Sequence, residues 1–515
     1  KGDPSMHRLV KNHLALVSIS VLVLGGAGFL LSMNGCGGVS NHESMKPPPP
    51  NYSLPHVVIV FQENRTPDNL FQGLCLPPNG SRTACNSISP GASQYDIASS
   101  GTDSTGANIP LSPIDLGTAG SNPDTYDLDH SHASFVDMCD LNPSAGMCTM
   151  DGANLIPTAC AGGSLGCAPP FPDPQFMYVN PADVQPYLTM AEQYTFADHM
   201  FQTNQGPSFP AHQFILSGTS APTATSNLFA AENGSHNDGC ISAPTVTVKL
   251  IDPTGSESSN PPIYPCYEHA TLTDLLDAAN ISWRYYAPSA GSIWTAPDAI
   301  QHMCGPNVTP PNATACVGAD WTGATARVVV GQTQNNPQVL ADIASGQLPQ
   351  VTWVIPDGQD SDHASLNDGC GPSWVTSIVN AIGSSPYWPN TTIILAWDDW
   401  GGWYDHVPPP QLLSDCAQWG CGYVYGFRVP MIVISPYAKP AYVSHVKHDF
   451  GSILKFIEMK FHLPSLGYAD AHALDDLSDI FNSSQTPNVF QPITPPPNDA
   501  SCKADTSAPT DPDDD

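Results

Sequence analysis

The stretch Thr391–Pro410, TTIILAWDDWGGWYDHVPPP, is the one from which the fold is predicted. It opens with the apolar run IILAW, the pattern of a buried strand, and glycines follow the strand. Two adjacent carboxylates, Asp398 and Asp399, come directly after the run, and Asp405 and His406 come a few residues later. Ligands of open α/β sheets bind outside the carboxyl ends of strands, and a cation relieves the repulsion between neighbouring carboxylates. The alternative is a solvated turn whose aspartates cap a helix.

Other apolar runs also end in polar side chains. Val57–Phe61 precedes Glu63 and Asn64, and Val351–Ile355 precedes a polar segment that contains His363. The alternation of strand and helix predicts a mostly parallel central sheet in a three-layer α/β sandwich. We therefore expect polar groups from four strand ends and one helix start to converge at one edge of the sheet. These positions are 61–64, 356–363, 397–406, Ser435 after the run 429–434, and Ser208.

Ser208 lies in the tight turn GPSFP, directly before a predicted helix over 211–217. The free N–H groups of a helix N-terminus face an anion, so a hydroxyl there is placed to attack a phosphate. The alternative is a serine that only caps the helix. The chain has no G-x-S-x-G motif, so the nucleophile elbow of an α/β-hydrolase is not supported.

The segment DLDHSH places His130 and His132 two residues apart. They are candidates for proton donors or ligands, and the alternative is that both are ordinary surface histidines.

Composition excludes some partners. The chain has 515 residues and a formal net charge of −32, which argues against nucleic acid. Its 54 prolines and 41 glycines predict long ordered loops, while a hydrophobic fraction of 41% is that of a globular protein. Oligomeric state is not predicted.

The N-terminal segment resembles an export signal. Positive residues after Met6 precede the apolar stretch Leu14–Leu31, and Cys36 follows a glycine, as at a lipoprotein cleavage site. A plain signal peptide and an uncleaved anchor are the alternatives. The expected location is periplasmic, secreted or lipid-anchored at the cell envelope. The predicted divisions are a signal over 1–36, a Pro-rich linker over 37–55, a catalytic domain over 56–482 and a disordered acidic tail over 483–515.

Fifteen cysteines support export, and many occur as close pairs that would clip local loops. The absence of a CxxC motif argues against a zinc–thiolate site. The pairing is left open by the sequence. The close pairs are Cys75/Cys85, Cys139/Cys148, Cys160/Cys167, Cys304/Cys316 and Cys416/Cys421.

Several segments in order resemble the bacterial phosphoesterase family of phosphatidylcholine-type phospholipases C and acid phosphatases. They are FQENRTPDNLFQG, DLDHSH, FADHMFQTNQGPSFPAHQFILSGTS, ILAWDDWGGWYDHVPPP and GFRVPMIVISPYAK. The resemblance spans about residues 55–465 and implies an alkaline-phosphatase-like fold with long disulfide-clipped loops. It implies Ser208 as nucleophile and His130 and His363 beside the transferred phosphoryl group. The implied metal positions are Glu63, Asn64, Asp398 and Asp399.

Three positions depart from the phospholipase pattern and lean toward the phosphatases. Asn69 stands where His is frequent, His212 where Asn-Arg is frequent, and Asp399 where Glu is frequent. The side chains expected to support the ligands or contact substrate are His132, Asp405, His406 and His212.

Phosphoryl transfer needs positioning and charge stabilisation, which a metal and a helix N-terminus supply. Oxygen ligands favour Ca²⁺, Mg²⁺, Mn²⁺ or Zn²⁺. The expected function is an exported, metal-dependent hydrolase of phosphate esters, of acid phosphatase type, with phospholipase C as the alternative. A sulfatase-like hydrolase fits less well, because Ala211 and His212 follow Ser208-Phe-Pro210 where an arginine is wanted. A non-catalytic surface binding protein is a further alternative, and it is less favoured because it would need no such set of polar groups.

Overall fold

The computed structural model describes residues 54–509 except 143–145, 161–163, 170, 234–238, 258–261, 334–336, 366–367 and 413–422. The predicted signal, the anchor at Cys36, most of the linker, and the pair Cys416/Cys421 lie outside the described residues. Within the described part of the chain, no helix is both long and apolar enough to cross a membrane.

An eight-stranded sheet forms the centre of the described chain. Seven strands run parallel and one, β19, runs antiparallel to both of its neighbours. In order across the sheet they are β16 (Val328–Val329), β15 (Trp283–Tyr286), β17 (Val351–Val354), β1 (His56–Gln62), β18 (Thr391–Trp397), β19 (Met431–Ile434), β11 (Thr195–Ala197) and β20 (Tyr442–Ser444).

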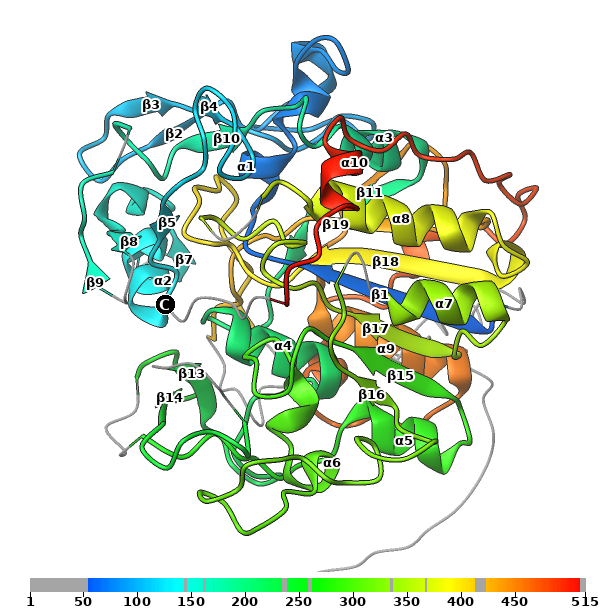
Figure 1. Cartoon of the computed structure of the whole chain (residues 1–515). Helices are drawn as coiled ribbons and strands as arrows, with labels where there is room; N and C mark the ends of the chain where they lie inside the picture. Colours follow the sequence, from blue (N-terminus) through cyan, green and yellow to red (C-terminus); the bar gives the residue numbers. More distant parts are fainter. Residues whose placement is uncertain are drawn as a thin grey trace, which may run out of the picture. The chain divides into compact units, whose positions relative to one another are not determined.

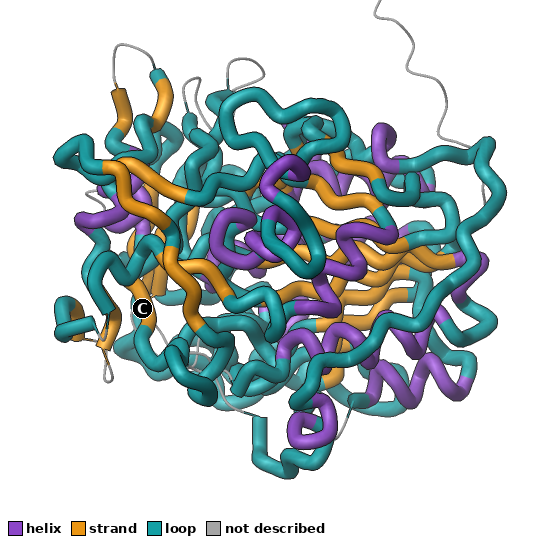
Figure 2. The backbone as a smooth tube through the Cα atoms, turned by 90° about the horizontal axis from the view of Figure 1, so that it is seen from above, coloured by secondary structure: helices purple, strands orange, loops and turns teal. Residues whose placement is uncertain are grey.

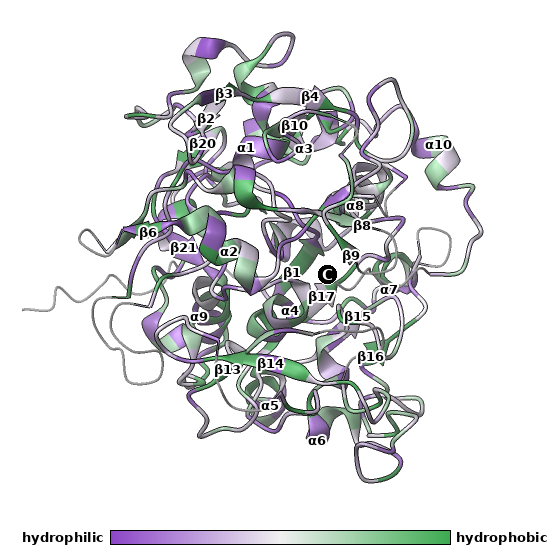
Figure 3. Ribbon diagram, turned by 90° about the vertical axis from the view of Figure 1, so that its left-hand side faces the viewer, coloured by the Kyte–Doolittle hydropathy of each residue, from purple (hydrophilic) through white to green (hydrophobic). Residues whose placement is uncertain are grey.

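The strands in the middle of the sheet are hydrophobic, since helices cover both faces of the sheet. Every residue of β18 is buried, as expected for a parallel strand with a continuous apolar run. β1 pairs with β18 from His56↔Thr391 to Gln62↔Trp397, so both strands end at the same edge. Figure 3 shows β1 and β17 coloured mainly as hydrophobic.

Helices lie on both sides of the sheet, which confirms the three-layer α/β prediction (Figures 1 and 2). One group packs α3 (Gln185–Gln193) and α7 (Gln338–Ser345) against α8 (Gly371–Gly383). The other packs α5 (Leu272–Ala278) and α9 (Phe450–Phe461) against α4 (Ser208–Ser217). α5 and α9 begin with capping boxes at Thr271 and Asp449.

The remaining elements are short helices and small sheets of two or three strands. The short helices are α1 (Pro67–Leu70), α2 (His132–Cys139), α6 (Gln301–Cys304) and α10 (Asp499–Cys502). The strand pairs and triples are β2 (Ser100–Thr102) with β3 (Asn108–Pro110), β4 (Ser112–Ile114) with β10 (Met177–Val179), β5 (Asp127–Leu128) with β8 (Thr158–Cys160) and β9 (Ser164–Leu165), β6 (Leu141–Asn142) with β7 (Met147–Cys148), β12 (Met200–Phe201) with β21 (His448–Asp449), and β13 (Phe229–Asn233) with β14 (Val248–Ile251).

The expectation that Ser435 would lie at the active edge is wrong. β19 is antiparallel to β18, so its carboxyl end lies beside the start of β18. The Ser435 hydroxyl accordingly donates a hydrogen bond to the Thr391 carbonyl, 3.1 Å away. The amino end of β19, at Arg428–Pro430, lies at the active edge instead.

Disulfides clip the loops as predicted. Three close pairs are bonded, and two longer links join cysteines that no short spacing suggested. The bonds are Cys75–Cys85, Cys139–Cys148, Cys304–Cys316, Cys240–Cys266 and Cys370–Cys502.

The prediction of a disordered tail does not hold for residues 483–502. This segment contains α10, and Cys502 is bonded to Cys370 at the start of α8. Asn380 of α8 also exchanges two hydrogen bonds of 2.8 Å with the backbone of Ile493.

Candidate active site

Polar side chains gather where β1 and β18 end. Glu63 and Asn64 follow β1, Asp398 and Asp399 follow β18, and all four are fully buried. Asn64 has a left-handed backbone (φ 58°), and its N–H donates to Asp398 Oδ1 at 3.0 Å. This bond ties the two strand ends together.

Gly401 makes the approach of the two strand ends possible. It has φ 61°, and a Cβ atom there would lie 2.3 Å from the Asn64 carbonyl oxygen. Only glycine fits this combination of conformation and contact. The Gly401 N–H donates to Asp399 Oδ1 at 2.8 Å, which fixes that carboxylate.

Ser208 is the first residue of α4, which begins three residues earlier than the sequence predicted. Its hydroxyl donates to Asp399 Oδ2 at 3.0 Å and lies 3.4 Å from Asn64 Oδ1. The side chain is 2% exposed. The preceding Gly206 is held against β13, where a Cβ atom would come within 1.9 Å of the Ala231 carbonyl oxygen. The turn therefore aims the hydroxyl at the carboxylates.

Glu63, His212 and Asp398 form a group that can hold a metal ion. His212 Nε2 lies 3.1 Å from Glu63 Oε1 and 3.6 Å from Asp398 Oδ2. Within the described residues, Glu63 Oε2 and Asp398 Oδ2 accept no hydrogen bond although both are buried. Unsatisfied carboxylate oxygens beside an imidazole fit a divalent cation. His212, expected from the sequence to support the ligands or contact substrate, thus lies within the group that could hold an ion.

The protonation of this group reflects burial and crowding of negative charge. Burial and the neighbouring Asp398 carboxylate raise the pKa of Glu63 well above its ordinary value. The same causes raise the pKa of Asp399 to about 8. Burial lowers the pKa of His212 to about 4, against the attraction of Asp398. A bound cation would relieve the repulsion that raises the carboxyl pKa values.

His130 and His363 lie next to each other at this edge, with ring centroids 5.8 Å apart. His130 Nε2 is 2.9 Å from Asn64 Nδ2, and its Nδ1 donates to the Leu128 carbonyl at 2.8 Å. Burial opposes the charged form of His130, but Asp399 and Asp127 outweigh it and raise its pKa. Burial lowers the pKa of His363 to about 3.

Three other predicted residues lie outside the contacts described above. His132 Nδ1 is 3.0 Å from the carbonyl of Gln205, three residues ahead of Ser208. Asp405 and His406 belong to a buried ion-pair network around Arg428.

Trp294 was not predicted from the sequence. Its ring stacks over His212 at 6.4 Å between centroids and lies 6.0 Å from the ring of His363. It is fully buried, and its indole N–H has no acceptor among the described residues. Trp294 comes from a Pro/Gly-rich excursion without periodicity, so no sequence signal marked it.

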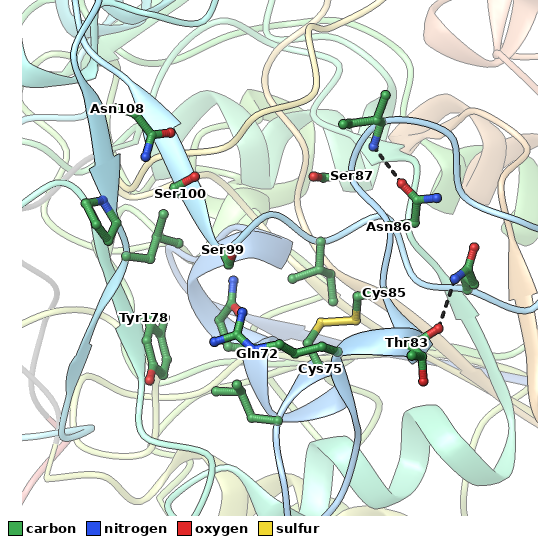
Figure 4. A pocket seen from close by; sticks show the side chains of 17 residues that line it. Gln72, Cys75, Thr83, Cys85, Asn86, Ser87, Ser99, Ser100, Asn108 and Tyr178 are labelled. Atoms are coloured by element: carbon green, nitrogen blue, oxygen red, sulfur yellow. Dashed lines mark hydrogen bonds between the residues drawn. A yellow bond between two sulfur atoms is a disulfide. The ribbon is translucent and has the colours of Figure 1, made fainter.

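A cavity of about 680 Å³ lies away from these residues. Figure 4 shows it beside the Cys75–Cys85 disulfide, with Asn86, Asn108 and Tyr178 in its wall. None of the predicted site residues lines it, so it is a separate feature of the first long excursion.

Comparisons with known proteins point to one family. A profile described as Phosphoesterase family matches residues 54–464. Non-hemolytic phospholipase C of Pseudomonas aeruginosa is 24% identical over 345 residues, which cover 62% of this chain and 45% of that protein. Phospholipase C A of Mycobacterium tuberculosis is 24% identical over 472 residues, which cover 85% of this chain and 79% of that protein. The chain thus spans about half the length of the first relative.

Among solved structures, one similarity is to a protein in the alkaline phosphatase superfamily from Vibrio parahaemolyticus. The TM-score is 0.31 at 10% identity, over 57% of this chain and 64% of that chain.

Proposed function

Because the chain belongs to the Phosphoesterase family, we propose that it hydrolyses phosphate esters with Ser208 as the nucleophile. The family match and the phospholipase C relatives support a hydrolase acting on phosphate ester bonds. The observation that carries the assignment of Ser208 is its hydroxyl at the start of α4, hydrogen-bonded to Asp399 at 3.0 Å.

The chain's own residues account for the main steps. The free N–H groups and dipole of α4 stabilise phosphate oxygens placed beside Ser208. Asp399 accepts the hydrogen bond of the hydroxyl and orients its oxygen for attack on phosphorus. His130, which contacts Asn64 and has a raised pKa, is the candidate to protonate the leaving oxygen. His363 lies beside it, and its lowered pKa keeps it neutral. Water then hydrolyses the phosphoserine.

We propose Glu63, Asn64, His212, Asp398 and Asp399 as the residues that hold a divalent cation. Bound there, it would neutralise phosphate charge and favour the ionised serine. Within the described residues, no lysine or arginine forms an ion pair with Glu63, Asp398 or Asp399, so their charge calls for another cation.

Replacement of Ser208 tests the proposal. We expect Ser208→Ala to lower kcat at least about a thousandfold, or roughly 4 kcal/mol of transition-state stabilisation. Ser217→Ala is a matched control, because Ser217 is buried at the far end of the same helix, and it should stay within about twofold. Acid quenching during turnover should leave phosphate on Ser208. A Ser208→Ala enzyme within tenfold of wild type would show that the serine is not the nucleophile.

The substrate proposed first is a phosphomonoester, because Asn69, His212 and Asp399 depart from the phospholipase pattern in the resemblance described above. A phosphatidylcholine-like lipid is the second candidate, because the relatives carry the name phospholipase C. Parallel kcat/KM values for p-nitrophenyl phosphate and phosphatidylcholine decide between them.

We also propose that the chain is exported, with the division into signal, linker and catalytic domain given above. Five described disulfides support folding in an oxidising compartment. Mass mapping of the exported protein should find few free thiols after residue 36, and six or more would contradict the proposal.

A further inference from the structure

The cavity beside the Cys75–Cys85 disulfide has the dimensions of a small-molecule site. Its volume of about 680 Å³ lies within the range that ligand pockets occupy. One wall comes from residues 72–97, and the other comes from β2, β3 and β10 (Figure 4). None of the residues proposed above for catalysis or metal binding lines it. A ligand bound here would therefore be distinct from the phosphate ester at Ser208.

The strand pair β2–β3 turns one face to the cavity because its other face packs on the core. Gly101 of β2 lies against buried Tyr404, and a Cβ atom at Gly101 would come within 2.4 Å of that ring. Side chains alternate along a strand. The residues on either side of this contact therefore face the opposite way, and Ser100 and Asn108 line the cavity.

Tyr178 of β10 faces the cavity for the same reason. Its neighbours Met177 and Val179 are buried in the core, while Tyr178 is half-buried and lines the cavity. Burial raises the pKa of Tyr178, and the Arg82 guanidinium opposes this rise. The guanidinium therefore lies near the phenol, although the two residues come from opposite walls.

The wall formed by residues 72–97 is fixed by its own bonds. Besides the disulfide, Asn86 exchanges hydrogen bonds of 2.8 and 3.2 Å with the backbone of Ser89. Gln94 donates to the Thr83 carbonyl at 2.9 Å. A wall held in this way needs no ordering when a ligand arrives, which favours binding.

Several polar side chains of the cavity are left for a ligand. Hydroxyl and amide groups both donate and accept hydrogen bonds, as the hydroxyls of a sugar do. Five such side chains have no hydrogen-bond partner among the described residues: Ser87, Ser99, Ser100, Asn108 and Tyr178.

No carboxylate lines the cavity, although the chain has 47 acidic residues and a formal net charge of −32. Two other pockets differ in this respect. One has Glu458 and Asp470 in its wall, and the other has Asp115 and Asp183. The cavity is thus a place where an anion meets no local repulsion.

Arg82 supplies the positive charge of the cavity. It is exposed and forms no ion pair within the part of the chain that the structure describes. A guanidinium without a partner binds a carboxylate or a phosphate through paired hydrogen bonds. The other described arginines are already paired: Arg65 with Asp124, Arg284 with Asp342, Arg327 with Asp320, and Arg428 with Asp405.

We propose that this cavity binds a sugar that carries one anionic group, either a carboxylate or a phosphate. Arg82 would hold the anion, and the unpartnered hydroxyl and amide groups would exchange hydrogen bonds with the sugar hydroxyls. Leu76, Ile97 and Leu111, which also line the cavity, would contact its C–H groups. A fatty acid fits less well, because its chain would leave these polar groups without partners.

The test is calorimetric titration of the full chain with glucuronate, with glucose as the neutral comparison. We expect glucuronate to bind with a dissociation constant at or below about 1 mM and glucose at least about tenfold more weakly. Arg82→Met should weaken glucuronate binding at least about tenfold, the effect of one charge-assisted hydrogen bond, and leave glucose binding unchanged. Asn108→Ala should weaken both about threefold. Lys503→Met removes a positive charge outside the cavity and should stay within about twofold.

The Ser208→Ala variant separates this site from the proposed active site. It should bind glucuronate as the wild type does, and loss of binding would place the sugar at Ser208 and overturn the proposal. Glucose 6-phosphate is titrated in the same background, where it is not hydrolysed. If Arg82→Met weakens its binding more than that of glucuronate, the preferred anion is a phosphate, and the opposite order makes it a carboxylate.

Three results would contradict a sugar site in this cavity. The first is a dissociation constant above about 1 mM for both anionic sugars. The second is glucuronate affinity that stays the same in both Arg82→Met and Asn108→Ala. The third is tighter binding of decanoate than of either anionic sugar, which would show a fatty-acid site instead.

Discussion

At the scale of single residues, the role of a buried carboxylate depends on what balances its charge. Asp405 looked like a site residue from its position after Asp398 and Asp399. In the structure both of its oxygens accept hydrogen bonds from Arg428, at 2.8 and 2.9 Å. Asp68 and Asp96 contact His406 at 2.7 and 2.9 Å, and although burial opposes it, these carboxylates raise the pKa of His406 to about 10. This network holds the loop after β18 in place.

Arg428→Met should therefore destabilise the protein by about 3–5 kcal/mol, because it leaves Asp405 and Asp68 buried without their cation. Urea unfolding measures the change. Arg82→Met, at an exposed arginine, should change the free energy of unfolding by less than about 0.5 kcal/mol. A loss below about 1 kcal/mol in Arg428→Met would show that the network is not important for stability.

At the scale of elements, the direction of one strand decides which residues reach the site. Apolar runs predict strands but not their direction, and β19 reads like its parallel neighbours. Because it is antiparallel, it places Arg428 rather than Ser435 at the active edge. Packing between short helices also depends on residues far apart in sequence. His302 of α6 contacts Glu268 at 2.9 Å and Asp274 of α5 at 3.4 Å.

His302 should make stability depend on pH. Its hydrogen bond to Asp274 and the nearby Glu268 outweigh burial and raise its pKa from 6.5 to about 9. A raised pKa stabilises the fold fully below pH 6.5, and this contribution is lost as pH rises to about 9. The difference in unfolding free energy between wild type and His302→Gln should shrink across this window. Gln301→Ala, at an exposed neighbour without a titrating group, should give a constant difference. The same constancy in His302→Gln would contradict the assignment.

At the scale of the whole described chain, the C-terminal segment is part of the fold. Cys370–Cys502 closes a loop of 132 residues that contains β18, β19 and α9. Ser373 donates to Asp499 at 2.7 Å, and Trp388 Nε1 donates to the Asn488 carbonyl at 3.0 Å. The segment thus covers α8 and the turn before β18.

Removal of this disulfide should destabilise the protein more than removal of a local one. Loop-closure entropy predicts a loss of up to about 5 kcal/mol for Cys370→Ala/Cys502→Ala and about 3 kcal/mol for Cys139→Ala/Cys148→Ala, which closes a separation of 9 residues. Denaturant midpoints of the two double variants provide the comparison. Equal losses would mean that the C-terminal segment is not fastened by this bond.

The sequence by itself determined the central strands and which polar residues follow them. Continuous apolar runs predicted the strands β1, β17 and β18. The polar residues directly after β1 and β18 therefore lie at the carboxyl ends of these strands, at one edge of the sheet. Local pattern was enough there because strand and polar group are adjacent in the chain.

Only the tertiary structure decided what depends on distant contacts. It set β19 antiparallel to its neighbours, placed Asp405 in an ion pair with Arg428, brought His212 beside Glu63 and Asp398, and stacked Trp294 on His212. It also paired Cys370 with Cys502. Each of these follows from which buried charges and apolar faces meet after folding, and spacing along the chain does not carry that information.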